Sequence, residues 1–102
     1  MKILLVCAGG MSTSLIVEKM KKEIEKRKIE DIKVDANTIE ELEQVIDDYD
    51  VVMVGPQIRY KEPYIKNLCA QRGKKYTIIP PAIYGSVDST KILDLAINLI
   101  NN

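Results

Sequence analysis

The sequence contains no histidine, no tryptophan and no phenylalanine, and it has only two cysteines. Without an imidazole the chain cannot itself supply a Ser-His-Asp triad, a Cys-His pair, a phosphohistidine or a His-ligated zinc ion. Without tryptophan or phenylalanine, an aromatic platform for single-stranded nucleic acid is not expected. A nucleophile belonging to this chain would therefore be a cysteine.

Excess charge of either sign is also missing. The 15 Lys+Arg residues balance the 15 Asp+Glu residues, which gives a formal net charge of +0. Proteins that bind nucleic acid or membrane surfaces rely on surplus basic charge, so neither partner is expected. No run approaches the roughly 20 apolar residues of a membrane span. The 102 residues, 46% of them hydrophobic, are enough for one domain spanning residues 1–102.

The two cysteines, Cys7 and Cys69, lie far apart and form no Cys-x-x-Cys motif. This spacing indicates reduced thiols and a cytoplasmic protein. Cys69 shares the apolar side of a predicted helix with Ile65 and Leu68, so we expect it to be structural. Cys7 ends the first apolar run and is the candidate for chemistry.

Short apolar runs alternate with amphipathic segments along the whole chain. The runs predict strands at 3–7, 32–36, 51–54 and 76–79. Helices are predicted from 12 or 13 to about 28, from 38 through 46, from 63 to about 73, and from 88 onward. Strands and helices in this order predict an α/β fold, in which a four-stranded parallel sheet of order 2-1-3-4, flavodoxin-like, is flanked by helices on both faces.

Several local signals support these boundaries. Thr38 and Glu41 have the spacing of a capping box, Pro63 suits a first helical turn, and Asp88 suits a helix cap. The first helix is predicted to bury a stripe of four apolar residues, namely Leu15, Ile16, Met20 and Ile24.

The loop after Cys7 occupies the usual ligand site of such a sheet, at the carboxyl end of a central strand. Gly9 and Gly10 allow a nest of backbone N–H groups, and hydroxyls follow at the start of a helix that favours anions. The same surroundings favour a thiolate at Cys7. The sequence thus predicts a nucleophile beneath a phosphate cradle formed by Ala8, Gly9, Gly10, Met11, Ser12, Thr13 and Ser14. A tight turn with ordinary helix caps remains the alternative.

Two further loops reach the same edge of the predicted sheet. Gln57 follows the third strand and Tyr84 follows the fourth, and both are candidate rim residues. Solvated loop residues are the plainer interpretation. An acidic region around residues 40–50 and a net basic region at 19–28 are candidates for orienting a partner, but solvated helix faces are the favoured interpretation.

The segment Cys7-Ala8-Gly9-Gly10-Met11-Ser12-Thr13-Ser14 resembles the active-site loop of enzyme IIB proteins of the bacterial sugar phosphotransferase system, lactose/cellobiose/chitobiose family. The triplet beginning at Gly55 and the segment beginning at Tyr84 resemble that family as well, and the resemblance covers essentially the whole chain.

The resemblance implies a phosphocarrier and a phosphotransferase. By position, Cys7 would accept a phosphoryl group from a phosphohistidine of the IIA component and pass it to a β-disaccharide held by the membrane component IIC. The phosphate cradle would be residues 8–14. No cofactor and no metal are implied, and we expect a monomer without direct membrane insertion.

Two other functions are weighed against this one. A low-molecular-weight tyrosine phosphatase also places a cysteine loop after its first strand, but its loop carries an arginine where this chain has Thr13. Without that guanidinium, the transition state of phosphate-ester cleavage loses its main cationic clamp. A binding module without covalent chemistry is the third possibility, in which Cys7 would be dispensable.

Overall fold

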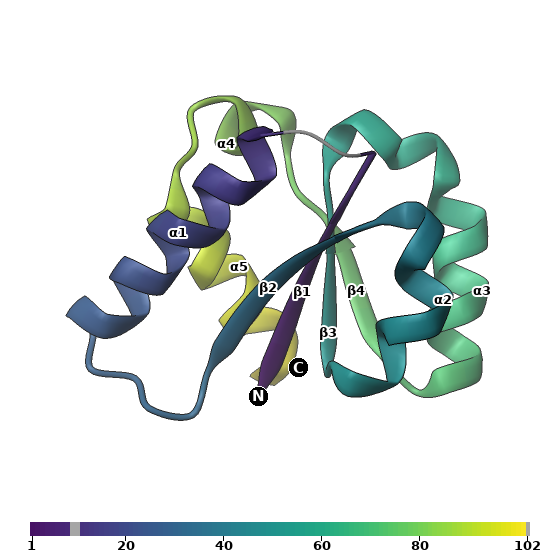
Figure 1. The fold of residues 1–102 in the computed structure, drawn as a ribbon, viewed down its shortest axis with the longest axis horizontal. Coiled ribbons are helices and arrows are strands. Elements are labelled where there is room, and N and C mark those ends of the chain that lie inside the picture. The colour runs from purple at the N-terminus through teal and green to yellow at the C-terminus, as the bar shows by residue number, and fades with distance from the viewer. Residues whose placement is uncertain (9–10, 102) are drawn as a thin grey trace.

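The computed structural model describes residues 1–8 and 11–101, which form a parallel sheet of four strands between layers of helices (Figure 1). The strands are β1 (Lys2–Cys7), β2 (Lys33–Thr38), β3 (Val51–Val54) and β4 (Lys75–Ile78). Their spatial order is β2-β1-β3-β4, and every pairing is parallel. The predicted fold class and strand order are confirmed.

The two central strands are the most apolar in the sequence because helices cover both of their faces. All residues of Ile3–Val6 and of β3 are buried. Alternate residues of β1 enter opposite halves of the core, with Ile3 and Leu5 on one side and Leu4 and Val6 on the other. The edge strand β2 keeps only Val34 buried.

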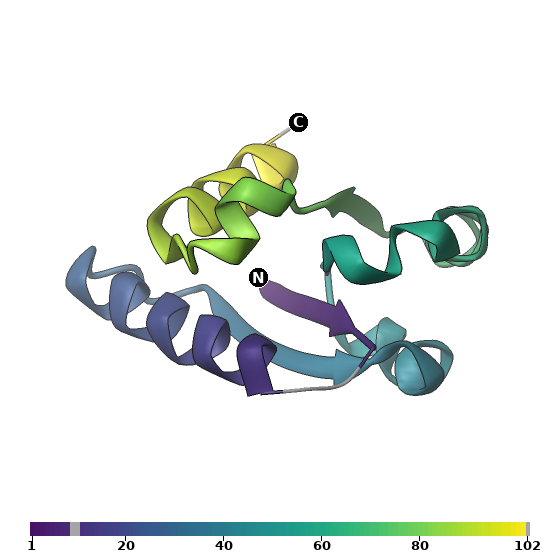
Figure 2. The same cartoon turned by 90° about the horizontal axis from the view of Figure 1, so that it is seen from above.

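The helices divide between the two faces of the sheet, as Figure 2 shows from above. One face is covered by α1 (Met11–Lys26), α4 (Pro81–Gly85) and α5 (Ser89–Asn101). The other carries α2 (Leu42–Val45) and α3 (Glu62–Arg72), with the 3₁₀ turns η1 (Ile39–Glu41), η2 (Ile46–Asp48) and η3 (Pro56–Lys61). Within the described residues, no helix is both long and apolar enough to cross a membrane.

The predicted apolar stripe of α1 is wrong at one position. Leu15 is 47% exposed, whereas Val17 is buried and packs with Met20 and Ile24. Three consecutive apolar residues, 15–17, allow more than one stripe by sequence alone. Val17 lies three residues before Met20 and seven before Ile24, which is the spacing of one helix face, and Leu15 falls outside it.

The predicted capping box is also wrong. Thr38 makes no side-chain cap hydrogen bond, and the chain turns into η1 rather than directly into an α-helix. Thr38 is instead the last residue of β2, where it pairs with Cys7, and its N–H donates to the Asn37 side chain at 2.9 Å. The strand therefore runs further than 32–36, and α2 is only a short segment between two 3₁₀ turns.

The other helix boundaries agree with the sequence signals. Pro63 lies in the first turn of α3, and Gly73 ends that helix in the left-handed conformation with φ 67°. Asp88 caps α5, because its Oδ1 accepts a hydrogen bond from the N–H of Lys91 at 3.1 Å. The sequence missed α4, which begins directly after Pro80.

Candidate active site

Cys7 is placed by β1 at the carboxyl edge of the sheet, beside the end of β2. It pairs with Thr38 in the strand register, and its thiol makes a weak hydrogen bond to the carbonyl oxygen of Asn37, with Sγ 3.8 Å from that oxygen. The side chain is 8% exposed, while the following residue, Ala8, is exposed. The sulfur thus lies just beneath the surface at the point where the central strand ends.

Helix α1 starts close behind Cys7 in the chain, at Met11 (Figure 1). The first backbone N–H groups of any α-helix have no partner within the helix, and the positive end of the helix dipole lies there. These groups favour an anion at this end of α1. The predicted nest at Gly9 and Gly10 lies outside the described residues, as do the side chains of Met11 and Ser12, and Ser14 is exposed.

Thr13 and Tyr84 meet inside the protein, although the sequence placed them in separate loops. The Thr13 Oγ1 and Tyr84 Oη atoms are 2.9 Å apart, and the residues are 3% and 6% exposed. Tyr84 was predicted as a rim residue, and the structure corrects this placement. The reason is α4, which the sequence missed and which turns the ring inward against the core of the α1 face.

The loop after β3 approaches the same region. Gly55 donates its N–H to the carbonyl oxygen of Val6 at 2.9 Å, directly before Cys7. A Cβ on Gly55 would lie 3.4 Å from that oxygen and 3.6 Å from Cε2 of Tyr84. Gln57 is exposed in η3, which follows β3, and its role as a rim residue stays a prediction.

A groove of about 430 Å³ borders the start of the Cys7 loop. Its lining comes from three segments, namely Ala8, Ile39, Glu40, Tyr60, Lys61 and Tyr64. Tyr60 and Tyr64 are 71% and 43% exposed, which is unusual for large apolar side chains. Ala8 belongs to the predicted phosphate cradle and Glu40 to the acidic region, but the sequence did not predict that these segments meet, because the approach of η1 to α3 depends on the fold.

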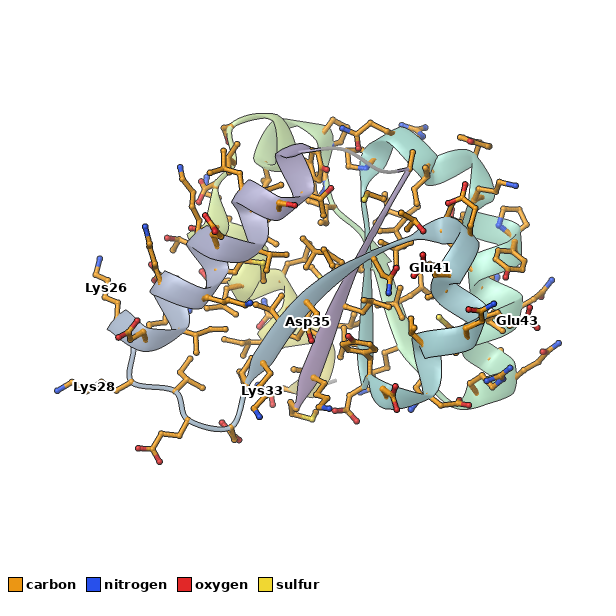
Figure 3. All side chains as sticks on the ribbon, viewed as in Figure 1. Lys26, Lys28, Lys33, Asp35, Glu41 and Glu43 are labelled. Carbon is orange, nitrogen blue, oxygen red and sulfur yellow. The ribbon has the colours of Figure 1, made fainter. Side chains whose placement is uncertain are left out.

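Lys26 projects from the end of α1 and Lys28 lies just beyond it, whereas Glu41 and Glu43 lie on η1 and α2 (Figure 3). Both layers carry charges of both signs, since α1 also contains Glu18 and α3 also contains Lys66. A second groove, of about 420 Å³, lies between the end of α1 and the start of β2, where Lys33 and Asp35 are found, away from Cys7.

Cys69 lies in α3 with 1% of its surface exposed, inside the core of the α2–α3 face. Burial raises the pKa of the Cys69 thiol, because the charged thiolate would lose its hydration. At pH 8 it therefore carries less thiolate than an ordinary cysteine.

We expect iodoacetamide to alkylate Cys7 well before Cys69 in the native protein, because burial raises the pKa of the Cys69 thiol and encloses it in the core. Peptide mass spectrometry after a timed reaction at pH 8 measures this ratio. In denaturant the two sites should react at similar rates. Equal modification under native conditions would contradict the assignment of Cys69 to the core.

The fold and the position of Cys7 define the class of this protein: a flavodoxin-like α/β protein with a thiol at the carboxyl edge of its central strand. A family model described as PTS system, Lactose/Cellobiose specific IIB subunit, matches residues 2–95. The PTS is the phosphoenolpyruvate:carbohydrate phosphotransferase system. The chain belongs to this family of IIB subunits.

Relatives of known identity match over nearly their whole length. The chain is 32% identical to the oligo-beta-mannoside-specific EIIB component of Bacillus subtilis (strain 168) over 101 residues, covering 99% of the chain and 97% of that protein. It is 30% identical to the cellobiose-specific EIIB component of Lactococcus lactis subsp. lactis (strain IL1403), covering 97% and 95%.

Solved structures show the same architecture. The solution structure of the cellobiose-specific IIB component from Borrelia burgdorferi superposes with a TM-score of 0.84 at 36% identity, covering 100% of this chain and 93% of that one. The lactose-specific IIB domain from Streptococcus pneumoniae gives a TM-score of 0.87 at 15% identity, covering 97% and 96%, and supports the fold alone. EIIB components act as phosphotransferases in sugar uptake and work with IIA and IIC partners.

Proposed function

We propose that this chain, as a single domain of residues 1–102, carries a phosphoryl group on Cys7 between a IIA protein and a sugar held by IIC. In the first step the Cys7 sulfur attacks the phosphorus of phosphohistidine on IIA. The S–P bond forms, the P–N bond breaks, and the imidazole leaves with the electron pair and is then protonated. In the second step a sugar hydroxyl oxygen attacks phosphorus, loses its proton, and releases the thiolate of Cys7.

The observation that carries this proposal is the position of Cys7 at the carboxyl end of β1, just ahead of the first turn of α1. N–H groups aimed at the transferring phosphoryl oxygens stabilise charge without a metal or cofactor. The phosphate cradle of the proposal is the backbone of residues 8–14. The missing histidine fits this division of roles, since the donor protein supplies the imidazole.

The sugar of the proposal is a β-linked disaccharide. The named relatives serve oligo-beta-mannosides, galactose and cellobiose, so sugars differ within the family. We propose that IIC selects among them and that this chain works in the cytoplasm as a monomer. The exposed Tyr60 and Tyr64 beside the Cys7 loop lie where a docked donor would cover them.

The phosphatase alternative lacks support at the residue that would carry it. Thr13 stands where the phosphatase loop has arginine, and its side chain is buried against Tyr84 rather than directed at a ligand. A phosphocysteine held mainly by N–H groups, with no guanidinium and no aligned base for water, should persist long enough to be transferred.

A transfer assay separates the two functions. The chain is incubated with phosphoenolpyruvate, the general phosphotransferase proteins and a lactose/cellobiose-type IIA, and then with membranes containing IIC and cellobiose or lactose. We expect sugar phosphate to form only when both IIA and this chain are present, and p-nitrophenyl phosphate to remain intact. Release of inorganic phosphate faster than sugar phosphate, or hydrolysis of p-nitrophenyl phosphate without IIA, would contradict the proposal.

A further inference from the structure

Thr13 and Tyr84 form a buried polar link between α1 and α4. Their oxygens are 2.9 Å apart, and the residues are separated by 71 positions in the sequence. Thr13 is the one polar residue that is buried among those whose burial the structure describes. A buried hydroxyl without a partner is costly, so this pair strongly favours one placement of the first turn of α1.

The ring of Tyr84 lies near the residue that follows β3. Its Cε2 lies near Gly55, and a Cβ at that glycine would stand 3.6 Å from it. The N–H of Gly55 bonds in turn to the carbonyl of Val6, the residue before Cys7. One side chain thus packs beside the end of β3, lies close to the end of β1, and holds the first turn of α1 through its hydroxyl.

We propose that Tyr84 is a positioning residue for phosphoryl transfer, which holds the first turn of α1 at a fixed place relative to Cys7 through its hydrogen bond to Thr13. The inference rests on the proposed function and adds a residue that never touches the phosphoryl group. In this proposal Thr13 has two roles: its hydroxyl binds Tyr84 inside the protein, and its backbone N–H faces the proposed anion site.

The effect on rate follows from the geometry of electrostatic catalysis. Donors stabilise a transition state only when they are already in place, and small displacements of positioned groups reduce rates strongly. If the free energy of one neutral hydrogen bond acts entirely on positioning, its loss lowers the rate about 2- to 13-fold. Binding of IIA occurs on the outer surface and does not depend on this buried pair.

The test compares kcat and KM for phosphoryl transfer from phospho-IIA in four single variants and one double variant. Tyr84→Phe keeps the ring and removes the hydroxyl, and Thr13→Val removes the other oxygen at nearly constant shape. We expect kcat to fall about tenfold in each, with KM for phospho-IIA unchanged, and the double variant to be no slower than either single one. Thr13→Ser keeps a hydroxyl and should retain most of the rate.

Tyr49→Phe is the matched control. Its hydroxyl also makes a hydrogen bond, to Asp35 Oδ2 at 3.1 Å, but it lies near the start of β1, since the adjacent Asp50 N–H bonds to Lys2. Its kcat should equal that of the wild type.

The possible outcomes separate this inference from the proposed function. A Tyr84→Phe protein with lowered Tm but unchanged kcat, or with raised KM alone, overturns the positioning role and leaves the phosphocarrier function standing. Wild-type protein that accepts no phosphoryl group from phospho-IIA overturns both. A fall in kcat shared by Tyr49→Phe also counts against the inference, whereas a fall confined to Tyr84→Phe and Thr13→Val supports it.

Discussion

Replacing Cys7 with serine is expected to abolish phosphoryl transfer while the fold survives. The substitution exchanges sulfur for oxygen at a site that is 8% exposed, where the thiol makes a weak hydrogen bond to the Asn37 carbonyl. A serine hydroxyl is a poor nucleophile without an adjacent base, and this chain has no histidine to provide one. Sugar phosphate formation should therefore drop below detection, while the far-ultraviolet circular dichroism spectrum stays unchanged.

Cys69→Ala is the matched control for that experiment. It also removes a buried thiol, but from the core of the α2–α3 face rather than from the carboxyl edge of β1. We expect a modest loss of stability and full transfer activity at a temperature where the variant is folded. If transfer persists in Cys7→Ser, a binding module without covalent chemistry is favoured. If transfer is lost in folded Cys69→Ala, the assignment of the nucleophile to Cys7 is contradicted.

Among the substitutions proposed for this protein, Leu4→Ala is expected to lower the free energy of unfolding the most. Leu4 is fully buried in the central strand, where it pairs with Asp35 and Val52 and packs into the core of the α2–α3 face. Removing a buried leucine side chain costs about 2–5 kcal/mol, because transfer free energy is lost and a cavity remains. In a domain of about 100 residues this corresponds to a fall in Tm of roughly 10–30 °C.

Leu15→Ala makes the same chemical change on the exposed side of α1, where the leucine is 47% exposed. Its effect should stay within about 0.5 kcal/mol, because alanine loses little contact there and has good helix propensity. Thermal unfolding of both variants checks the burial pattern directly. If the two variants unfold at similar temperatures, Leu4 does not occupy the core position described.

The strand order was predictable because the two central strands carry continuous apolar runs, and because short βαβ crossovers restrict how four parallel strands can be arranged. The buried apolar stripe of α1 was harder to predict, since the consecutive apolar residues 15–17 satisfy more than one periodic pattern. Thr38 has the residue types of a capping box, but its pairing with Cys7 extends β2 and leaves no side-chain cap. In that place, tertiary pairing outweighs the local signal.

The candidate site, too, could be predicted from the sequence only in part. The loop after Cys7 could be singled out from the sequence, because glycines and hydroxyl residues after a central strand are typical of anion-binding loops, and its role as a phosphate cradle stays a prediction. The contact of Thr13 with Tyr84 could not, since it joins residues 71 positions apart. Tyr84 was predicted as a rim residue because it follows the fourth strand, whereas the chain turns there into the short helix α4, which begins at Pro81. A helix start with proline in its first turn was the signal overlooked.

The most direct measurement of the central claim is the site of phosphorylation. The chain is incubated with phosphoenolpyruvate, the general phosphotransferase proteins and IIA, digested under conditions that preserve thiophosphate, and analysed by tandem mass spectrometry. We predict one phosphoryl group, on Cys7, that disappears when IIC membranes and sugar are added and that never forms without IIA. A phosphoryl group on any serine, threonine or tyrosine, on Cys69, or on no residue at all would contradict the account.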